Sequence, residues 1–159
     1  MKQIVVLGAG IGGMSVAYEL RAALGKDKAA ITVVGEGTKF SFTPSNPWVA
    51  VGWRKPADIQ VDAPTHLAKK AIGFEAAGAE RVVPESNQVV LRGGRMLDYD
   101  YLVIATGPRL AFDEVPGLGP SAHTQSICTT EHAQTAWAAY EQFLKDPGPI
   151  VIGAAPGVS

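Results

Sequence analysis

The sequence predicts an α/β fold in which a parallel sheet is accompanied by a small antiparallel β-meander. Two observations carry this prediction. An apolar, β-branched run at residues 4–7 passes through a glycine turn into a helical pattern, which is typical of the first strand and helix of a nucleotide-binding domain. Between residues 79 and 97 the pattern changes to short alternating segments separated by turn residues, which indicates antiparallel strands.

The composition excludes several classes of function. The 159 residues are 47% hydrophobic, enough for one core, and a formal net charge of −1 gives no electrostatic basis for binding nucleic acid. No apolar run approaches the roughly 20 residues of a membrane span, and no signal peptide precedes the first strand. The single cysteine excludes an internal disulfide, and with the three scattered histidines it forms no recognisable metal site. We therefore expect a metal-free chain that is cytoplasmic or peripheral on a membrane.

The glycine turn at residues 8–13 is the clearest motif. Gly8, Gly10 and Gly13 follow the first strand at G-x-G-x-x-G spacing. The first glycine permits the turn, the second lets the backbone approach a pyrophosphate, and the third lets helix and strand pack closely. The phosphates would lie at the helix N-terminus, among free N–H groups and the positive end of the dipole. The motif predicts a dinucleotide site, with a purely structural turn as the alternative.

An acidic residue follows the second predicted strand. The first helix continues to Leu24 and stops at Gly25, and residues 30–34 form the next strand of a βαβ unit. An acid about 20 residues past the glycines accepts hydrogen bonds from an adenosine ribose. Glu36 is the candidate, although Gly35 occupies the position that usually holds the acid. A solvated loop charge is the alternative interpretation.

An aromatic and proline-rich connection occupies residues 40–53, where a simple βαβ unit has its crossover helix. Pro44 and Pro47 stiffen the path, while Ser45 and Asn46 offer polar groups among aromatic side chains. Such a segment can form the wall of a site for a flat ring system. The alternative is a hydrophobic loop that covers the edge of the sheet.

The middle of the chain returns to the parallel sheet after the meander. A short helix and a strand are predicted between residues 65 and 76, ahead of the three meander segments. Residues 99–108 are then predicted to form a buried strand closed by a small-residue turn. That turn, Ala105-Thr106-Gly107, permits close backbone approach and offers one hydroxyl.

The cysteine lies just before a predicted helix. Residues 133–144 repeat apolar side chains at helical spacing, with Thr129 or Thr130 as the cap. At that position Cys128 feels the helix dipole and nearby N–H donors, which favour the thiolate, and His132 lies within one turn of it. The alternative is that the cysteine is a small buried hydrophobic residue.

The end of the chain repeats its opening pattern. Residues 149–152 are predicted to form an apolar strand, followed by a turn in which Ala155 replaces the middle glycine. A Cβ at the point of pyrophosphate approach argues against a good NAD site at this second turn.

We interpret the chain as an N-terminal fragment, because this last strand needs a covering helix and none follows it. The predicted domains are an incomplete first dinucleotide-binding domain at residues 1–108, a linker loop at 109–129, and the truncated start of a second such domain at 130–159. The linker interpretation follows from the length of a segment without periodicity.

Four segments together resemble the sulfide:quinone oxidoreductases, along essentially the whole chain: SFTPSNPWVAVGW, DYDYLVIATGPRLAF, SICTTEHA and PGPIVIGAAPGVS. The resemblance implies a Rossmann-like FAD-binding domain of the pyridine nucleotide-disulfide oxidoreductase superfamily. The implied enzyme oxidises sulfide and passes the electrons through FAD to a quinone at the membrane. The neighbouring relatives leave two alternatives, an NADH:quinone or NADH:disulfide oxidoreductase and the flavoprotein subunit of a flavocytochrome sulfide dehydrogenase. A flavin-binding module without chemistry of its own is a third.

The resemblance also implies the positions of the cofactor and the substrate. The resemblance implies FAD contacts at Gly8, Gly10, Ile11, Gly12 and Gly13 for the pyrophosphate, near Ala79 for the adenine, and at Ser45, Asn46, Thr106 and Gly107 for the flavin end. Gly35 and Glu36 depart from the family pattern and stay candidates for the ribose, and Ala105 joins the candidates as the first residue of the small-residue turn. Cys128 and His132 are the implied catalytic residues on the sulfide side. Peripheral membrane association would come from a C-terminal part outside this chain, oligomerisation is left open, and we expect these residues alone to be inactive.

Overall fold

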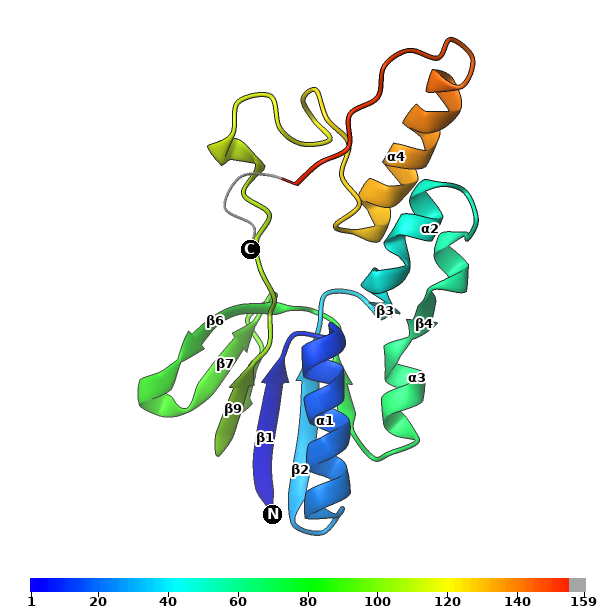
Figure 1. Cartoon of the computed structure of the whole chain (residues 1–159). Coiled ribbons are helices and arrows are strands. Elements are labelled where there is room, and N and C mark those ends of the chain that lie inside the picture. The colour runs from blue at the N-terminus through cyan, green and yellow to red at the C-terminus, as the bar shows by residue number, and fades with distance from the viewer. Residues whose placement is uncertain (155–159) are drawn as a thin grey trace. The chain divides into compact units, whose positions relative to one another are not determined.

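A computed structural model describes residues 1–154, which form two compact units. Unit 1 comprises Met1–Phe42 and Ala57–Ala111, and unit 2 comprises Thr43–Pro56 with the residues from Phe112 on. Figure 1 shows both units, with most of their elements labelled. The segment Thr43–Pro56 therefore groups with the C-terminal part of the chain. The domain boundaries predicted after residues 108 and 129 remain a prediction.

A parallel sheet forms the centre of unit 1. Among the described residues it has four strands in the order β5-β2-β1-β9. The strands are β1 (Lys2–Leu7), β2 (Ala29–Val34), β5 (Gly73–Glu75) and β9 (Tyr101–Ile104). The chain moves from β1 to β2 and β5 on one side and returns to β9 on the other, so β1 and β9 flank a topological switch point. The predicted α/β fold with a parallel sheet is confirmed.

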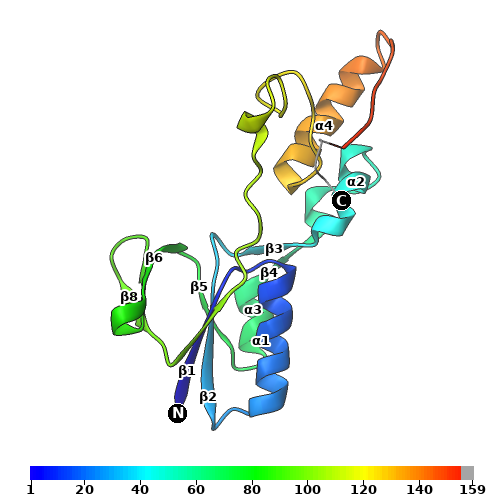
Figure 2. The same ribbon diagram turned by 60° about the vertical axis from the view of Figure 1, so that its left-hand side comes forward.

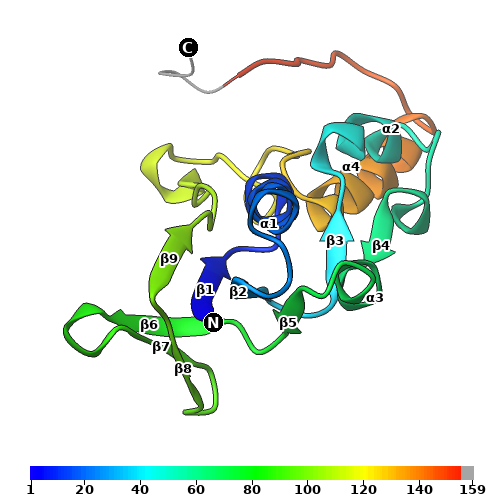
Figure 3. The ribbon, with the colours of Figure 1, turned by 90° about the horizontal axis from the view of Figure 1, so that it is seen from below.

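The two faces of this sheet have different covers. Helices α1 (Ile11–Leu24) and α3 (Ala63–Ala68) lie on one face, and an antiparallel meander lies on the other (Figures 2 and 3). The meander consists of β6 (Ala79–Val83), β7 (Gln88–Leu91) and β8 (Met96–Asp98). Val6 faces the helices, whereas Val5 and Leu7 face Val89 and Leu91 of β7. Because both faces are covered, the first strand is a continuous apolar run.

The remaining elements lie mainly in unit 2 and in the connection after β2. Strands β3 (Lys39–Ser41) and β4 (Gln60–Asp62) pair antiparallel. Helix α2 (Asn46–Ala50) and helix α4 (Thr130–Phe143) pack side by side in unit 2. Short 3-10 turns occur at Thr43–Ser45, Pro56–Asp58, Pro84–Ser86 and Phe112–Glu114. No helix within residues 1–154 is both long and apolar enough to cross a membrane.

Three expectations about local structure are corrected. The connection at residues 40–53 includes the end of β3 and the whole of helix α2. The helix can form there because Pro47 lies in its first turn, where the missing N–H is not needed. Strand β9 is not fully buried, since Ile104 is 68% exposed at the edge of the described sheet. Residues 149–152 form no strand, because no described strand supplies them with backbone partners. The turn with Ala155 lies outside the described residues.

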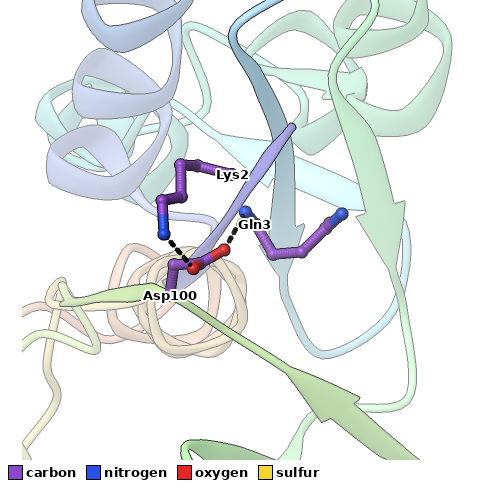
Figure 4. A network of polar contacts seen from close by, with 3 residues as sticks. All are labelled: Lys2, Gln3 and Asp100. Carbon is purple, nitrogen blue, oxygen red and sulfur yellow. Dashed lines mark hydrogen bonds and ion pairs between the residues drawn. The ribbon is translucent and has the colours of Figure 1, made fainter.

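Asp100 fastens the start of β1 to the turn before β9 (Figure 4). Its two carboxylate oxygens accept hydrogen bonds from Lys2 Nζ and the Gln3 backbone N–H, each at 2.7 Å. The Asp100 backbone N–H donates to the Gln3 carbonyl at 2.8 Å. The Gln3 N–H, followed by Lys2, holds the pKa of Asp100 below its ordinary value.

We expect Asp100→Asn to be less stable than the wild type in a pH-dependent way. Since the folded-state pKa of Asp100 is lowered, its stabilisation is fully present above about pH 4 and is lost as the pH falls through the folded-state value. Thermal denaturation should show a melting temperature about 2 °C lower at pH 7, with the difference closing in acid. A difference that stays constant between pH 7 and pH 2 would contradict this role of the charge.

Candidate dinucleotide site and cysteine helix

Gly8 and Gly13 make close backbone contacts that no other residue could make. Gly8 has φ +108°, and a Cβ there would lie 2.1 Å from the Ala105 carbonyl oxygen. A Cβ on Gly13 would lie 1.9 Å from the Gly8 carbonyl oxygen. The predicted roles of Gly8 in the turn and of Gly13 in helix–strand packing are confirmed.

The other residues of the turn leave space for a ligand. A Cβ on Gly10 or Gly12 would meet no described atom within 4 Å. Gly10 is the N-terminal cap of α1, and no side chain there accepts a hydrogen bond from the first N–H groups of the helix. Ile11, the first residue of the helix, is 40% exposed. A helix N-terminus with free N–H groups, approached over glycine, fits the pyrophosphate of a dinucleotide. The predicted order of strand, glycine turn and helix is therefore confirmed.

The turn after β9 lies at the same edge of the sheet. The Ala105 backbone N–H donates to the Leu7 carbonyl at 2.8 Å, and the Gly8 N–H donates to the Val34 carbonyl at 2.8 Å. Thr106 and Gly107 follow as exposed residues, and a Cβ on Gly107 would meet no described atom within 4 Å. The structure thus brings the two predicted turns together at the switch point.

Gly35 has a packing role that the sequence did not reveal. It is buried at the end of β2, and a Cβ there would lie 2.7 Å from Ala9 Cβ and 3.0 Å from the Phe74 ring. Its N–H donates to the Glu75 carbonyl at 2.8 Å. A glycine is needed at this position because a side chain would separate the glycine turn from β5.

Glu36 forms an ion pair and lies next to the residues predicted to surround the adenosine. Its carboxylate forms an ion pair with Arg92 at 2.6 Å, with both side chains more than half exposed. A Cβ on Gly78 would lie 3.0 Å from Glu36 Cγ, and Ala79 is the next residue, at the start of β6. The structure therefore places Glu36, Ala79 and Arg92 at one end of the sheet. Sequence reasoning missed Arg92, because 56 residues separate it from its partner.

Ser45 and Asn46 are held inside unit 2. They are 2% and 1% exposed. Arg54 Nη1 donates to Ser45 Oγ at 2.8 Å, and the same guanidinium lies 4.5 Å from the centre of the Trp48 ring. Asn46 Oδ1 accepts a hydrogen bond from Thr130 Oγ1 at 3.3 Å. The hydrogen bond at Ser45 therefore connects the start of α2 to Arg54 in the loop after it, and the bond at Asn46 connects α2 to α4.

Cys128 is exposed directly before the cap of α4, so the alternative of a buried packing residue is wrong. Thr129 is the cap, since its Oγ1 accepts from the His132 backbone N–H at 3.1 Å. The His132 ring lies 5.6 Å from the Phe112 ring, and its buried Nδ1 has no hydrogen-bond partner within residues 1–154. An exposed thiol therefore precedes the cap of α4, and the first turn of the helix carries an imidazole whose Nδ1 has no hydrogen-bond partner among the described residues.

The sequence profile of the family described as "Pyridine nucleotide-disulphide oxidoreductase" matches residues 2–156. The chain belongs to this family. Within residues 1–154, no group of three or more His, Cys, Asp or Glu residues is placed to hold a metal ion.

Two curated relatives of this pyridine nucleotide-disulphide oxidoreductase chain are sulfide oxidoreductases. The chain is 43% identical over 158 residues to the sulfide-quinone reductase of Aquifex aeolicus, covering 99% of this chain and 36% of that protein. It is 30% identical over 156 residues to the mitochondrial sulfide:quinone oxidoreductase of Dictyostelium discoideum, covering 97% and 34%. The chain therefore spans about a third of the length of these relatives, and the predicted resemblance is confirmed.

Solved structures agree with this relationship. The sulfide:quinone oxidoreductase of Aquifex aeolicus superimposes with a TM-score of 0.90 at 42% identity, covering 100% of this chain and 36% of that one. A NAD-dependent persulfide reductase from A. fulgidus gives a TM-score of 0.71 at 26% identity, covering 88% and 28%. The predicted Rossmann-like α/β fold is therefore confirmed.

Proposed function

We propose that this chain is the N-terminal FAD-binding part of an enzyme that oxidises sulfide and passes the electrons through FAD to a quinone. The observation that carries the proposal is the 43% identity to a sulfide-quinone reductase along 99% of the chain. The open glycine cradle at the switch point supports it, because its geometry fits a dinucleotide cofactor.

In this proposal unit 1 binds the adenosine diphosphate half of FAD. The turn from Gly8 to Gly13 holds the pyrophosphate, with Gly10 and Gly12 allowing the close approach. Glu36 accepts hydrogen bonds from the ribose, with Gly35 behind it and Ala79 beside the adenine. When bound, FAD supplies the two-electron redox chemistry, and the protein orients it.

The remaining proposed residues belong to the turn after β9 in unit 1 and, separately, to unit 2. Ala105, Thr106 and Gly107 supply the small-residue turn, and the segment with Ser45 and Asn46 supplies buried polar groups. Cys128 and His132 are the proposed catalytic residues. The cysteine offers an exposed thiol that can act as nucleophile, and the imidazole can carry the proton that the thiol releases.

The partners of the whole protein are also proposals. Sulfide is the electron donor and a quinone the acceptor, as the names of the relatives indicate. We propose peripheral attachment to a membrane through a part of the relatives' length that this chain does not span. The proposed function does not depend on an oligomeric assembly.

The test is an anaerobic titration of the whole FAD-loaded protein. We expect sulfide to bleach the flavin absorbance and added quinone to restore it, whereas NADH leaves the absorbance unchanged. Bleaching by NADH but not by sulfide would instead identify an NADH:quinone or NADH:disulfide oxidoreductase. Restoration by cytochrome c but not by quinone would favour the flavocytochrome alternative.

A further inference from the structure

The first turn of α4 has one side anchored inside unit 2. Cys128 and Thr129 precede this turn, and Thr129 caps it, since its Oγ1 accepts a hydrogen bond from the His132 N–H at 3.1 Å. Thr130 is different, because it is only 3% exposed although it is the first residue of the helix. A buried hydroxyl must find a hydrogen-bond partner, since an unpaired one lowers the stability of the fold.

The partner of this hydroxyl comes from a distant part of the chain. Thr130 Oγ1 donates to Asn46 Oδ1 at 3.3 Å across 84 residues of sequence. Asn46 is 1% exposed and begins α2, the helix that packs on α4. The bond therefore joins the starts of the two packed helices.

The rest of the α2–α4 contact is mainly apolar and less directional. Val49 and Ala133 are buried there, and Gly52 approaches so closely that a Cβ would lie 2.6 Å from the Trp137 ring. Apolar packing holds two helices together, but it tolerates small rotations of one helix about its axis better than a hydrogen bond does. The Asn46–Thr130 bond is thus the contact best suited to fix the rotation of the first turn of α4.

We propose that Thr130 is a positioning residue that acts through Asn46 to set the orientation of Cys128 and His132. The inference rests on the proposed function for these two residues. Cys128 lies two residues before Thr130 and His132 two residues after it, so a rotation of this turn moves both. The loop before the helix adds little restraint, since among residues 1–154 the Cys128 N–H donates to a residue of the same loop, Ser126 Oγ, at 3.2 Å.

Thr130 gives a cleaner test than Asn46. Asn46 Nδ2 is buried without a partner within residues 1–154, so a substitution of Asn46 removes a second polar atom as well as the bond. Thr130→Val keeps the shape of the side chain and removes the hydroxyl, whereas Thr130→Ser keeps the hydroxyl. Thr135→Val is the matched control, because the exposed Thr135 on the same helix donates only to its local Glu131 carbonyl, at 3.1 Å.

The experiment measures two properties of the whole FAD-loaded protein. The first is the rate at which iodoacetamide alkylates Cys128, followed by mass spectrometry of its peptide. The second is the rate of flavin reduction by sulfide. We expect T130V to change the alkylation rate about threefold or more and to slow flavin reduction about tenfold, with T130S and T135V close to the wild type.

Each outcome is decisive. Wild-type alkylation and reduction rates in T130V would overturn the proposal, as would a T130S protein that behaves like T130V. A T130V protein that fails to fold would also overturn it, because the bond would then serve the fold and not the orientation of Cys128. If the wild type is not reduced by sulfide, the proposed function fails, but the alkylation rates still test the positioning role.

As a second test, Asn46→Ala should give the same direction of change in the alkylation rate of Cys128. The double variant N46A/T130V should then be no more affected than the stronger single variant, since both substitutions remove one bond. Additive effects in the double variant would show that the two residues act independently.

Discussion

Cys128→Ser in the whole protein is expected to lower the rate of flavin reduction by sulfide about 100-fold or more. A thiolate is a far stronger nucleophile than a serine hydroxyl, which is not ionised at neutral pH, and bonding of sulfide to the thiol sulfur would release a proton and two electrons that FAD takes up as the oxidant. Because Cys128 is exposed, the substitution leaves no cavity and breaks no core contact. The loss should therefore be one of chemistry and not of folding.

Rapid-mixing absorbance measurements of flavin reduction would provide the rate. FAD content and melting temperature should match the wild type within error. Ser126→Ala is the control for disturbance of the loop, because it removes the hydroxyl that accepts from the Cys128 N–H and spares the thiol. Wild-type rates in C128S would remove Cys128 from the proposed mechanism.

Gly8→Ala is expected to destabilise unit 1 by about 3 kcal/mol or more. The new Cβ would lie 2.1 Å from the Ala105 carbonyl oxygen, and the residue would keep a φ of +108° that L side chains rarely adopt. The Ala105 carbonyl belongs to the main chain, and the position of the Cβ is fixed by the backbone of residue 8, so neither atom can swing away as the end of a flexible side chain could.

Gly10→Ala is the matched comparison for Gly8→Ala. A Cβ on Gly10 meets no described atom within 4 Å, and Gly10 has φ −81°, so the substitution should leave the stability of the FAD-free protein nearly unchanged. Its affinity for FAD should nevertheless fall about tenfold or more, because the Cβ occupies the approach to the pyrophosphate. Denaturant unfolding and FAD titration of both variants would separate the two effects. Equal losses of stability would contradict the assignment.

Local patterns predicted the parts of the fold that depend on neighbours in sequence. The strand–glycine–helix run, the stop of α1 at Gly25 and the alternating meander segments all follow from backbone geometry within a few residues. The cap of α4 was narrowed to two threonines, and only the structure assigns it to Thr129. The separate roles of Gly8 and Gly13 could be predicted because the glycine spacing itself encodes them.

Contacts between distant residues could not be predicted from one sequence. The Glu36–Arg92 pair and the Asn46–Thr130 bond span 56 and 84 residues, and neither partner carries a local signal for the other. The burial of Gly35 against Phe74 depends on the crossover that brings β5 beside β2. For residues 149–152, apolar composition alone was not enough, because a strand needs neighbouring backbone to pair with.

The close approach of Gly8 to Ala105 also affects the entropy that is lost when a cofactor binds. The Ala105 carbonyl occupies the space that a Cβ of residue 8 would need, so the two turns lie directly against each other and form one rim. The rim is also held by the backbone bonds from Gly8 to Val34 and from Ala105 to Leu7. Its order is therefore established when unit 1 folds, and binding of the pyrophosphate loses little conformational entropy at this rim.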